Sequence, residues 1–139
     1  MRRRDERGSI AVELVILVPA VMMLLGLLVA GGRVWVARSE LTDVAQDAAR
    51  AASLAGNAGQ ARSYANRVVG QSRATSGCVG VSVQVDGSGF ARPVGSPATV
   101  RTRVSCQVSV SELGLPGAPG SITVEGRGSS ALDSYRERE

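Results

Sequence analysis

The residues whose chemistry stands out are three near the N-terminus: Gly8, Ser9 and Glu13. Glu13 stands at the head of an otherwise uncharged run that ends at Gly32, and a carboxylate in apolar surroundings is costly unless it has a partner. Because Gly8 has no side chain, a protease could approach the backbone closely there. Cleavage after Gly8 would give Ser9 a free amine, and that amine on a neighbouring subunit could neutralise Glu13. We therefore predict Gly8 and Ser9 as a processing site and Glu13 as a subunit-docking residue.

Each of these residues also has a purely structural explanation. Gly8 could be the flexible residue that often precedes a membrane helix. Glu13 lies about 7 Å along a helix from Gly8, so it could lie at the level of lipid headgroups. The helix dipole also favours an anion in an early turn. Neither explanation accounts for an apolar run that begins before Glu13, at Ile10.

Cys78 and Cys106 are the two cysteines of the chain, and in an exported domain such a pair is expected to form a disulfide. Two buried free thiols are the alternative. Cys106 is in phase with the valines of its predicted strand, whereas Cys78 is out of phase with the valines that follow it. We therefore expect Cys78 to lie just before its strand, or a bulge to correct the phase.

The composition argues against an enzyme. The 139 residues include no His and no Lys, so Ser–His–Asp and Cys–His arrangements and Schiff-base chemistry lack a component. Two cysteines without His cannot complete a zinc site, and we expect no metal and no cofactor. The arginines are interleaved with acids instead of forming a basic stripe, so we expect no nucleic-acid partner.

One long helix is predicted to position the N-terminal residues. Residues 1–8 form a basic leader, and residues 9–32 are long enough to cross a bilayer core as a helix. The arginines of the leader favour a cytoplasmic N-terminus and an extracytoplasmic remainder. Pro19 should loosen the helix locally. Trp35, just past the apolar run, is either an interfacial anchor or a core residue.

Residues 33–74 are predicted to continue as an extracytoplasmic helical stalk, broken near residues 56–59. Apolar positions, mainly Ala, recur there at spacings of three and four, as expected for one face of a helix. A second, shorter helix is predicted over residues 60–72. The Ala-rich face would let a partner surface approach closely.

The remaining chain is predicted to form a small β module over residues 75–128 and a charged tail over residues 129–139. Val alternates with polar residues in the clearest strands. The predicted strands cover residues 79–85, 100–110 and 121–125. The predicted fold class is α+β: a single long N-terminal helix, transmembrane and then amphipathic, followed by a small, mostly antiparallel three-stranded β module. Its Val face should pack against the Ala-rich helix or the second helix.

With these residues in view, the chain resembles the TadE-like proteins of the tight-adherence (Flp) type IV pilus system, which are pseudopilins or minor pilins. The resemblance covers about residues 7–55. It depends on the type IV prepilin-like leader and the point where that leader meets the apolar run, on Pro19 six residues after Glu13, and on an Ala-rich segment downstream. The matching motifs are Arg7-Gly8-Ser9-Ile10-Ala11-Val12-Glu13-Leu14 and Ala48-Ala49-Arg50-Ala51-Ala52.

The resemblance implies cleavage after Gly8 by a prepilin peptidase, a membrane aspartic enzyme. It also implies insertion with the N-terminus inside and a role in building or priming a thin adhesive fibre. Many members have an aromatic residue where this chain has Leu14. The exported part is far too large for the tiny major pilin of this system, so a minor or accessory subunit fits better.

The sequence thus predicts a non-enzymatic pseudopilin or minor-pilin-like subunit, processed after Gly8 and packed through its N-terminal helix. Its expected partners are the prepilin peptidase, other pilin-like subunits, the membrane assembly platform and the lipid bilayer. One alternative is an uncleaved single-pass membrane-anchored protein with a small extracytoplasmic binding domain. A second is a secreted domain whose signal peptide is cut near Gly31, although the apolar run is longer than a usual h-region.

Overall fold

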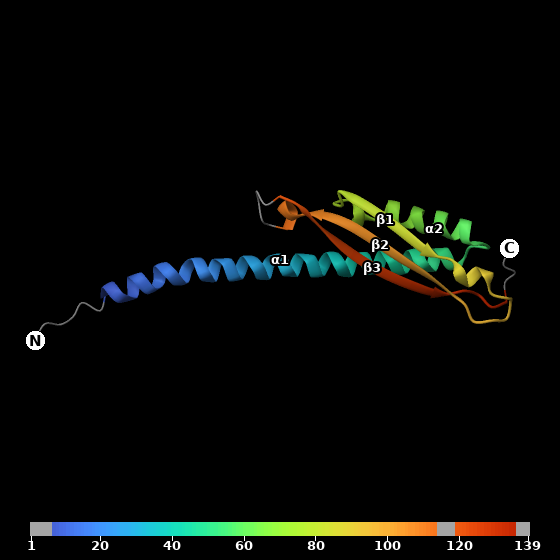
Figure 1. Cartoon of the computed structure of the whole chain (residues 1–139), viewed down its shortest axis with the longest axis horizontal. Helices are drawn as coiled ribbons and strands as arrows, with labels where there is room; N and C mark the ends of the chain where they lie inside the picture. The colour runs from blue at the N-terminus through green and yellow to red at the C-terminus, as the bar shows by residue number, and fades with distance from the viewer. Residues whose placement is uncertain (1–6, 114–118, 136–139) are drawn as a thin grey trace, which may run out of the picture.

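The computed structural model describes residues 7–113 and 119–135, and the side chains of residues 7–12 and of Glu112 and Leu113 are not described. Most of the predicted leader and the last four residues of the predicted tail therefore lie outside the described residues. A long helix extends well beyond a small head, where a second helix and a three-stranded sheet lie against its C-terminal half (Figure 1). The predicted α+β fold class is confirmed.

The long helix, α1, runs from Arg7 to Ser53 and is continuous through Pro19. It ends where Leu54 and Ala55 donate backbone hydrogen bonds three residues back, to Ala51 and Ala52, in place of the four-residue pattern of a helix. The local sequence thus ends α1 shortly before the Gly56-Asn57 pair.

The second helix, α2, runs from Ala58 to Gln71. The Asn57 side chain caps it by accepting a hydrogen bond of 2.9 Å from the Gln60 amide. Its buried residues, Ala61, Ala65 and Val69, recur at spacings of four and pack on α1. A short 3-10 helix, η1 (Arg73–Thr75), leads from α2 to the sheet.

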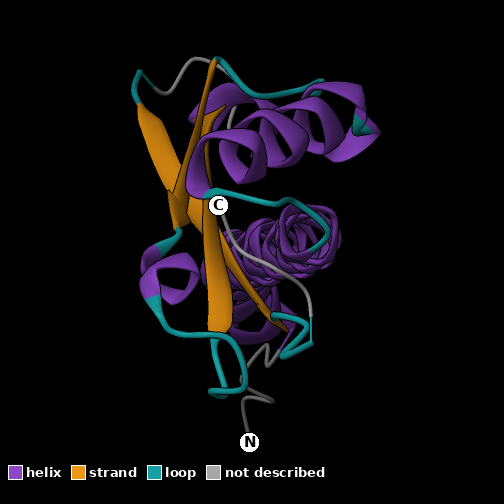
Figure 2. Cartoon of the chain, turned by 90° about the vertical axis from the view of Figure 1, so that its right-hand side faces the viewer, coloured by secondary structure: helices purple, strands orange, loops and turns teal. Residues whose placement is uncertain are grey.

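The sheet consists of β1 (Gly80–Asp86), β2 (Thr99–Ser109) and β3 (Ser121–Ala131), in the order β1-β2-β3 with both pairs antiparallel. Short 3-10 helices follow the first two strands, η2 at Ser88–Ala91 and η3 at Val110–Leu113. The sheet covers one side of α1, and α2 packs against α1 beside the first strand (Figure 2).

The third strand is longer than the sequence predicted. Alternation of apolar residues stops at Glu125, but β3 continues to Ala131, so the strand takes up residues that we assigned to the charged tail. Gly126 and Gly128 interrupt the apolar pattern, yet they pair with Val104 and Thr102 of β2. A side chain at either position would overlap the backbone of α1, which passes directly over them. This contact explains why glycines interrupt the apolar pattern inside a strand, and no local pattern reveals it.

The core lies between α1, α2 and the inner face of the sheet. Leu41, Val100 and Val104 are its largest fully buried side chains. Most other members are alanines, at positions 45, 48, 49, 52, 55, 61, 65 and 98. Trp35 is 73% exposed, so its alternative assignment as a core residue was wrong.

Candidate functional site

The N-terminal half of α1 has no packing partner within the described chain. From Leu14 to Val29 its large apolar side chains are between 44% and 79% exposed, and we call this stretch the apolar segment. By length and composition, α1 is long and apolar enough to cross a membrane. Lipid or the helices of other subunits can therefore cover a surface that this chain leaves open.

The predicted processing and docking residues lie at the start of this helix. The backbone of Gly8 and Ser9 belongs to the first turns of α1, and Glu13 is exposed five residues after Gly8. Among the residues whose side chains are described, from Glu13 onward, none forms an ion pair with Glu13. The helix thus presents an exposed carboxylate directly before the apolar segment.

The C-terminal half of α1 packs against the sheet at unusually short range. A Cβ atom added at Gly126 would overlap the Leu41 carbonyl group, and one at Gly128 would overlap that of Ala45. Two glycines on one strand therefore let the helix backbone approach the sheet backbone directly. This contact holds the C-terminal half of α1 in a fixed orientation relative to the sheet.

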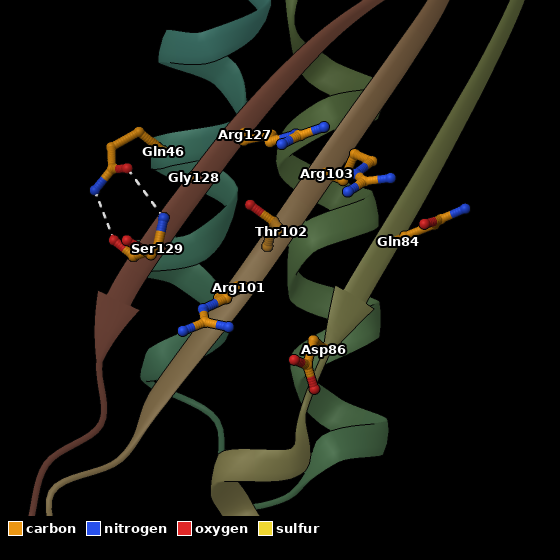
Figure 3. A pocket seen from close by; sticks show the side chains of 9 residues that line it. All are labelled: Gln46, Gln84, Asp86, Arg101, Thr102, Arg103, Arg127, Gly128 and Ser129. Atoms are coloured by element: carbon orange, nitrogen blue, oxygen red, sulfur yellow. Dashed lines mark hydrogen bonds between the residues drawn. The ribbon is translucent and has the colours of Figure 1, made fainter.

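Two polar side chains fix the same contact. Thr102 of β2 is 3% exposed, and its hydroxyl donates a hydrogen bond of 2.6 Å to the Ala45 carbonyl. Gln46 extends beside β3, where its amide nitrogen donates to the Ser129 carbonyl at 2.8 Å. Its amide oxygen accepts from the Ser129 amide at 3.1 Å (Figure 3). Gln46 thereby satisfies part of the free edge of the sheet.

The two cysteines form a disulfide, with 5.4 Å between their Cα atoms. Cys78 lies two residues before β1, as the first of our two alternatives predicted, and the β1–β2 register runs without a bulge. In that register Val81 is opposite Cys106, so the valines of β1 share a face with Cys106. The alternative of two free thiols was wrong, and neither sulfur is available as a thiolate nucleophile.

The face of the sheet turned away from α1, here called the outer face, is polar. Arg101 and Arg103 alternate with Thr102, which points toward α1, and Arg127 pairs with Arg103 across the ladder. These arginines border a shallow open hollow of about 590 Å³ (Figure 3). The sequence analysis missed this cluster because pairing between strands, which is not visible in a linear pattern, brings the arginines together.

One carboxylate of the outer face has a shifted pKa. Hydrogen bonds from Ser88, first that of its side chain and then that of its backbone, lower the pKa of the Asp86 carboxyl below its ordinary value. Arg101 lowers it further by charge attraction. The Ser88 amide is 3.0 Å from the carboxylate oxygen. Among the described residues, no three His, Cys, Asp or Glu side chains are grouped so that they could hold a metal ion.

Over the described residues, these features define a protein with one helix long and apolar enough to cross a membrane and a small α+β head. Residues 8–50 match the family model described as TadE-like protein, which confirms over that segment the resemblance seen in the sequence. The match ends within α1, before α2 and the sheet. No curated protein and no solved structure matches the chain significantly.

Proposed function

We propose that the chain is a pseudopilin or minor-pilin subunit of a tight-adherence pilus system. It acts without catalysis, is processed after Gly8, and assembles through α1. The observation that carries this proposal is the division of α1 into two halves: the head packs around the second half, and the apolar segment is left open. The match of residues 8–50 to the TadE-like family connects that helix to the pilus system.

In this proposal, α1 first anchors the subunit in the membrane, with the leader in the cytoplasm and the head outside. The four arginines before Gly8 favour that orientation. The prepilin peptidase then cuts after Gly8, and the membrane assembly platform transfers the subunit into a fibre. There the apolar segment exchanges lipid for the helices of neighbouring pilin-like subunits.

Glu13 acts in the docking step. Its carboxylate, at the start of the apolar segment, would meet the Ser9 amine of a neighbouring subunit in an environment of low dielectric constant, where an opposite charge is strongly favoured. The pair would fix how far one helix is displaced along the next. The exposure of Glu13, directly before the apolar segment, supports this role.

An uncleaved anchored protein with a binding head remains the second candidate, and the hollow of the outer face favours it. Three arginines and a shallow cavity on an exported face are suited to an acidic ligand. In that case α1 serves only as an anchor, and Glu13 has no docking partner.

Substitution of Glu13 tests the docking role. We expect Glu13→Gln, which removes the charge and keeps the shape, to insert into the membrane normally but to be absent from purified fibres. Glu13→Asp is the matched control, because it retains the charge and should be incorporated at least in part. Immunoblotting of membrane and sheared-fibre fractions measures both steps, and normal incorporation of Glu13→Gln would contradict the proposal.

A further inference from the structure

The outer face of the sheet carries one positive charge that has no ion-pair partner among the described residues. Arg127 forms an ion pair with Glu125 at 3.6 Å, and Asp86 interacts electrostatically with Arg101. Arg103 lies two residues after Arg101 on β2 and directly opposite Arg127 of β3. It forms no ion pair within the described residues. Since like charges opposite each other destabilise a sheet, an acidic group from outside would stabilise this position.

The opposite side of α1 carries a matching acidic stripe, formed by Glu40, Asp43 and Asp47. All three are exposed, and helical geometry places them within a sector of about 60°. Asp47 forms an exposed ion pair with Arg50 at 3.9 Å, whereas Glu40 and Asp43 form none within the described chain.

The acidic stripe lies on the side of α1 away from the sheet. Leu41 and Ala45 meet the sheet, and Gln46 bonds its edge, so the stripe residues project in the other direction. The view along α1 shows the sheet on one side of the helix, and on the opposite side no helix or strand of the described residues (Figure 2).

The acidic stripe and the outer face lie at the same height along α1. Gly126 touches α1 at Leu41 and Gly128 touches it at Ala45, so Arg127 lies level with the helix segment that contains Asp43. Arg103, the pairing partner of Arg127, lies at the same level. Each chain therefore presents opposite charges on two opposite sides at one distance from its N-terminal anchor.

We propose that the outer face of one chain docks on the acidic stripe of a second copy of this chain. Two copies anchored in parallel in one bilayer have their heads at the same height, so Arg103 of one copy meets Asp43 and Glu40 of the next without an axial shift. The contact is heterologous, because each copy uses a different surface, and it leaves one free surface at each end of a row. Rows of subunits therefore form in the membrane before any fibre.

Lipid phosphate is a poorer occupant of the outer face. Asp43 is 11 residues beyond Gly32, which places this level about 16 Å past the end of the apolar run. Headgroup layers extend only about 5–8 Å beyond each side of the hydrocarbon core. The proposed contact requires anchoring by α1 but not cleavage after Gly8, so it can be tested apart from the processing step.

The test measures self-association of the full-length chain in phosphatidylcholine vesicles. Energy transfer between donor- and acceptor-labelled copies is followed while lipid is added to dilute them. The variants are Arg103→Glu, Asp43→Arg and the double variant that carries both changes. Arg67→Glu, an exposed charge reversal on α2, is the matched control. Circular dichroism and an intact disulfide establish that each variant is folded, and Glu40→Arg replaces Asp43→Arg if that variant is not.

We expect each single reversal to weaken self-association about tenfold, the double variant to recover it, and the control to have no effect. Added salt should weaken the wild-type contact. Wild-type chains that dissociate as freely as a monomeric membrane helix would overturn the proposal, as would single reversals without effect or a double variant that fails to recover. None of these results bears on processing after Gly8, so failure here is distinct from failure of the pilin function.

Discussion

Gly126→Ala tests the short contact between α1 and the sheet. The added methyl group would overlap the backbone of Leu41, and backbone cannot move aside as a flexible side chain can. The helix must therefore shift away from β3, which also strains the hydrogen bond between Thr102 and the Ala45 carbonyl. Overpacking of this kind costs about 1–3 kcal/mol.

The change also has a favourable component, since Ala in a strand is more stable than Gly by about 0.5–1 kcal/mol. We expect a net loss of about 1–2 kcal/mol. For a head of this size that loss lowers the midpoint of thermal unfolding by about 4–16 °C. Thermal unfolding of the full-length chain in detergent micelles, followed by far-UV circular dichroism, measures it.

Gly80→Ala is the matched control on the same sheet. Its added methyl group would meet only the Gln107 side chain, at 3.5 Å, which is an ordinary contact. This variant should unfold at the wild-type temperature or slightly above it. Equal midpoints for Gly126→Ala and wild type, or an equal loss for Gly80→Ala, would refute the close-packing argument.

Two further predictions concern the edge and the outer face of the sheet. Gln46→Ala removes both hydrogen bonds to Ser129, so we expect a loss of about 1 kcal/mol and faster hydrogen exchange of the Ser129 amide; unchanged exchange would contradict this. Because its pKa is lowered in the folded chain, Asp86 contributes stability above pH ~3.9 that is lost as the pH falls through the folded pKa. The stability difference between wild type and Asp86→Asn, measured in urea, should therefore shrink as the pH falls from about 5 through the folded pKa, and a constant difference would exclude the Ser88 contribution.

Local patterns were sufficient to predict most of the fold. The apolar run and the Ala-rich stripe are helical periodicities within one segment, and the alternating valines of β1 and β2 mark strands in the same way. The Gly–Asn cluster after Leu54 correctly indicated a break between helices. The phase of Cys78 against the valines left two possibilities, a position just before the strand or a bulge, and the structure shows the first.

The features that the sequence did not reveal depend on contacts between distant segments. In the sequence, Gly126 and Gly128 have the pattern of a strand end. Their real role, which is to let α1 pass directly over the strand, depends on a segment about 80 residues away in the chain. Arg103 and Arg127 are 24 residues apart, and only the β2–β3 register makes them neighbours. The extended third strand and the charged outer face were therefore both missed.

The mass of the mature N-terminus decides between a processed pilin-like subunit and an uncleaved anchored protein. The chain is isolated from host membranes and sheared fibres, and its N-terminal peptide is identified by mass spectrometry. Our account predicts that the mature chain begins at Ser9. A mature chain that retains Met1–Gly8 would leave Glu13 without the amine that it requires, and would contradict the pilin function.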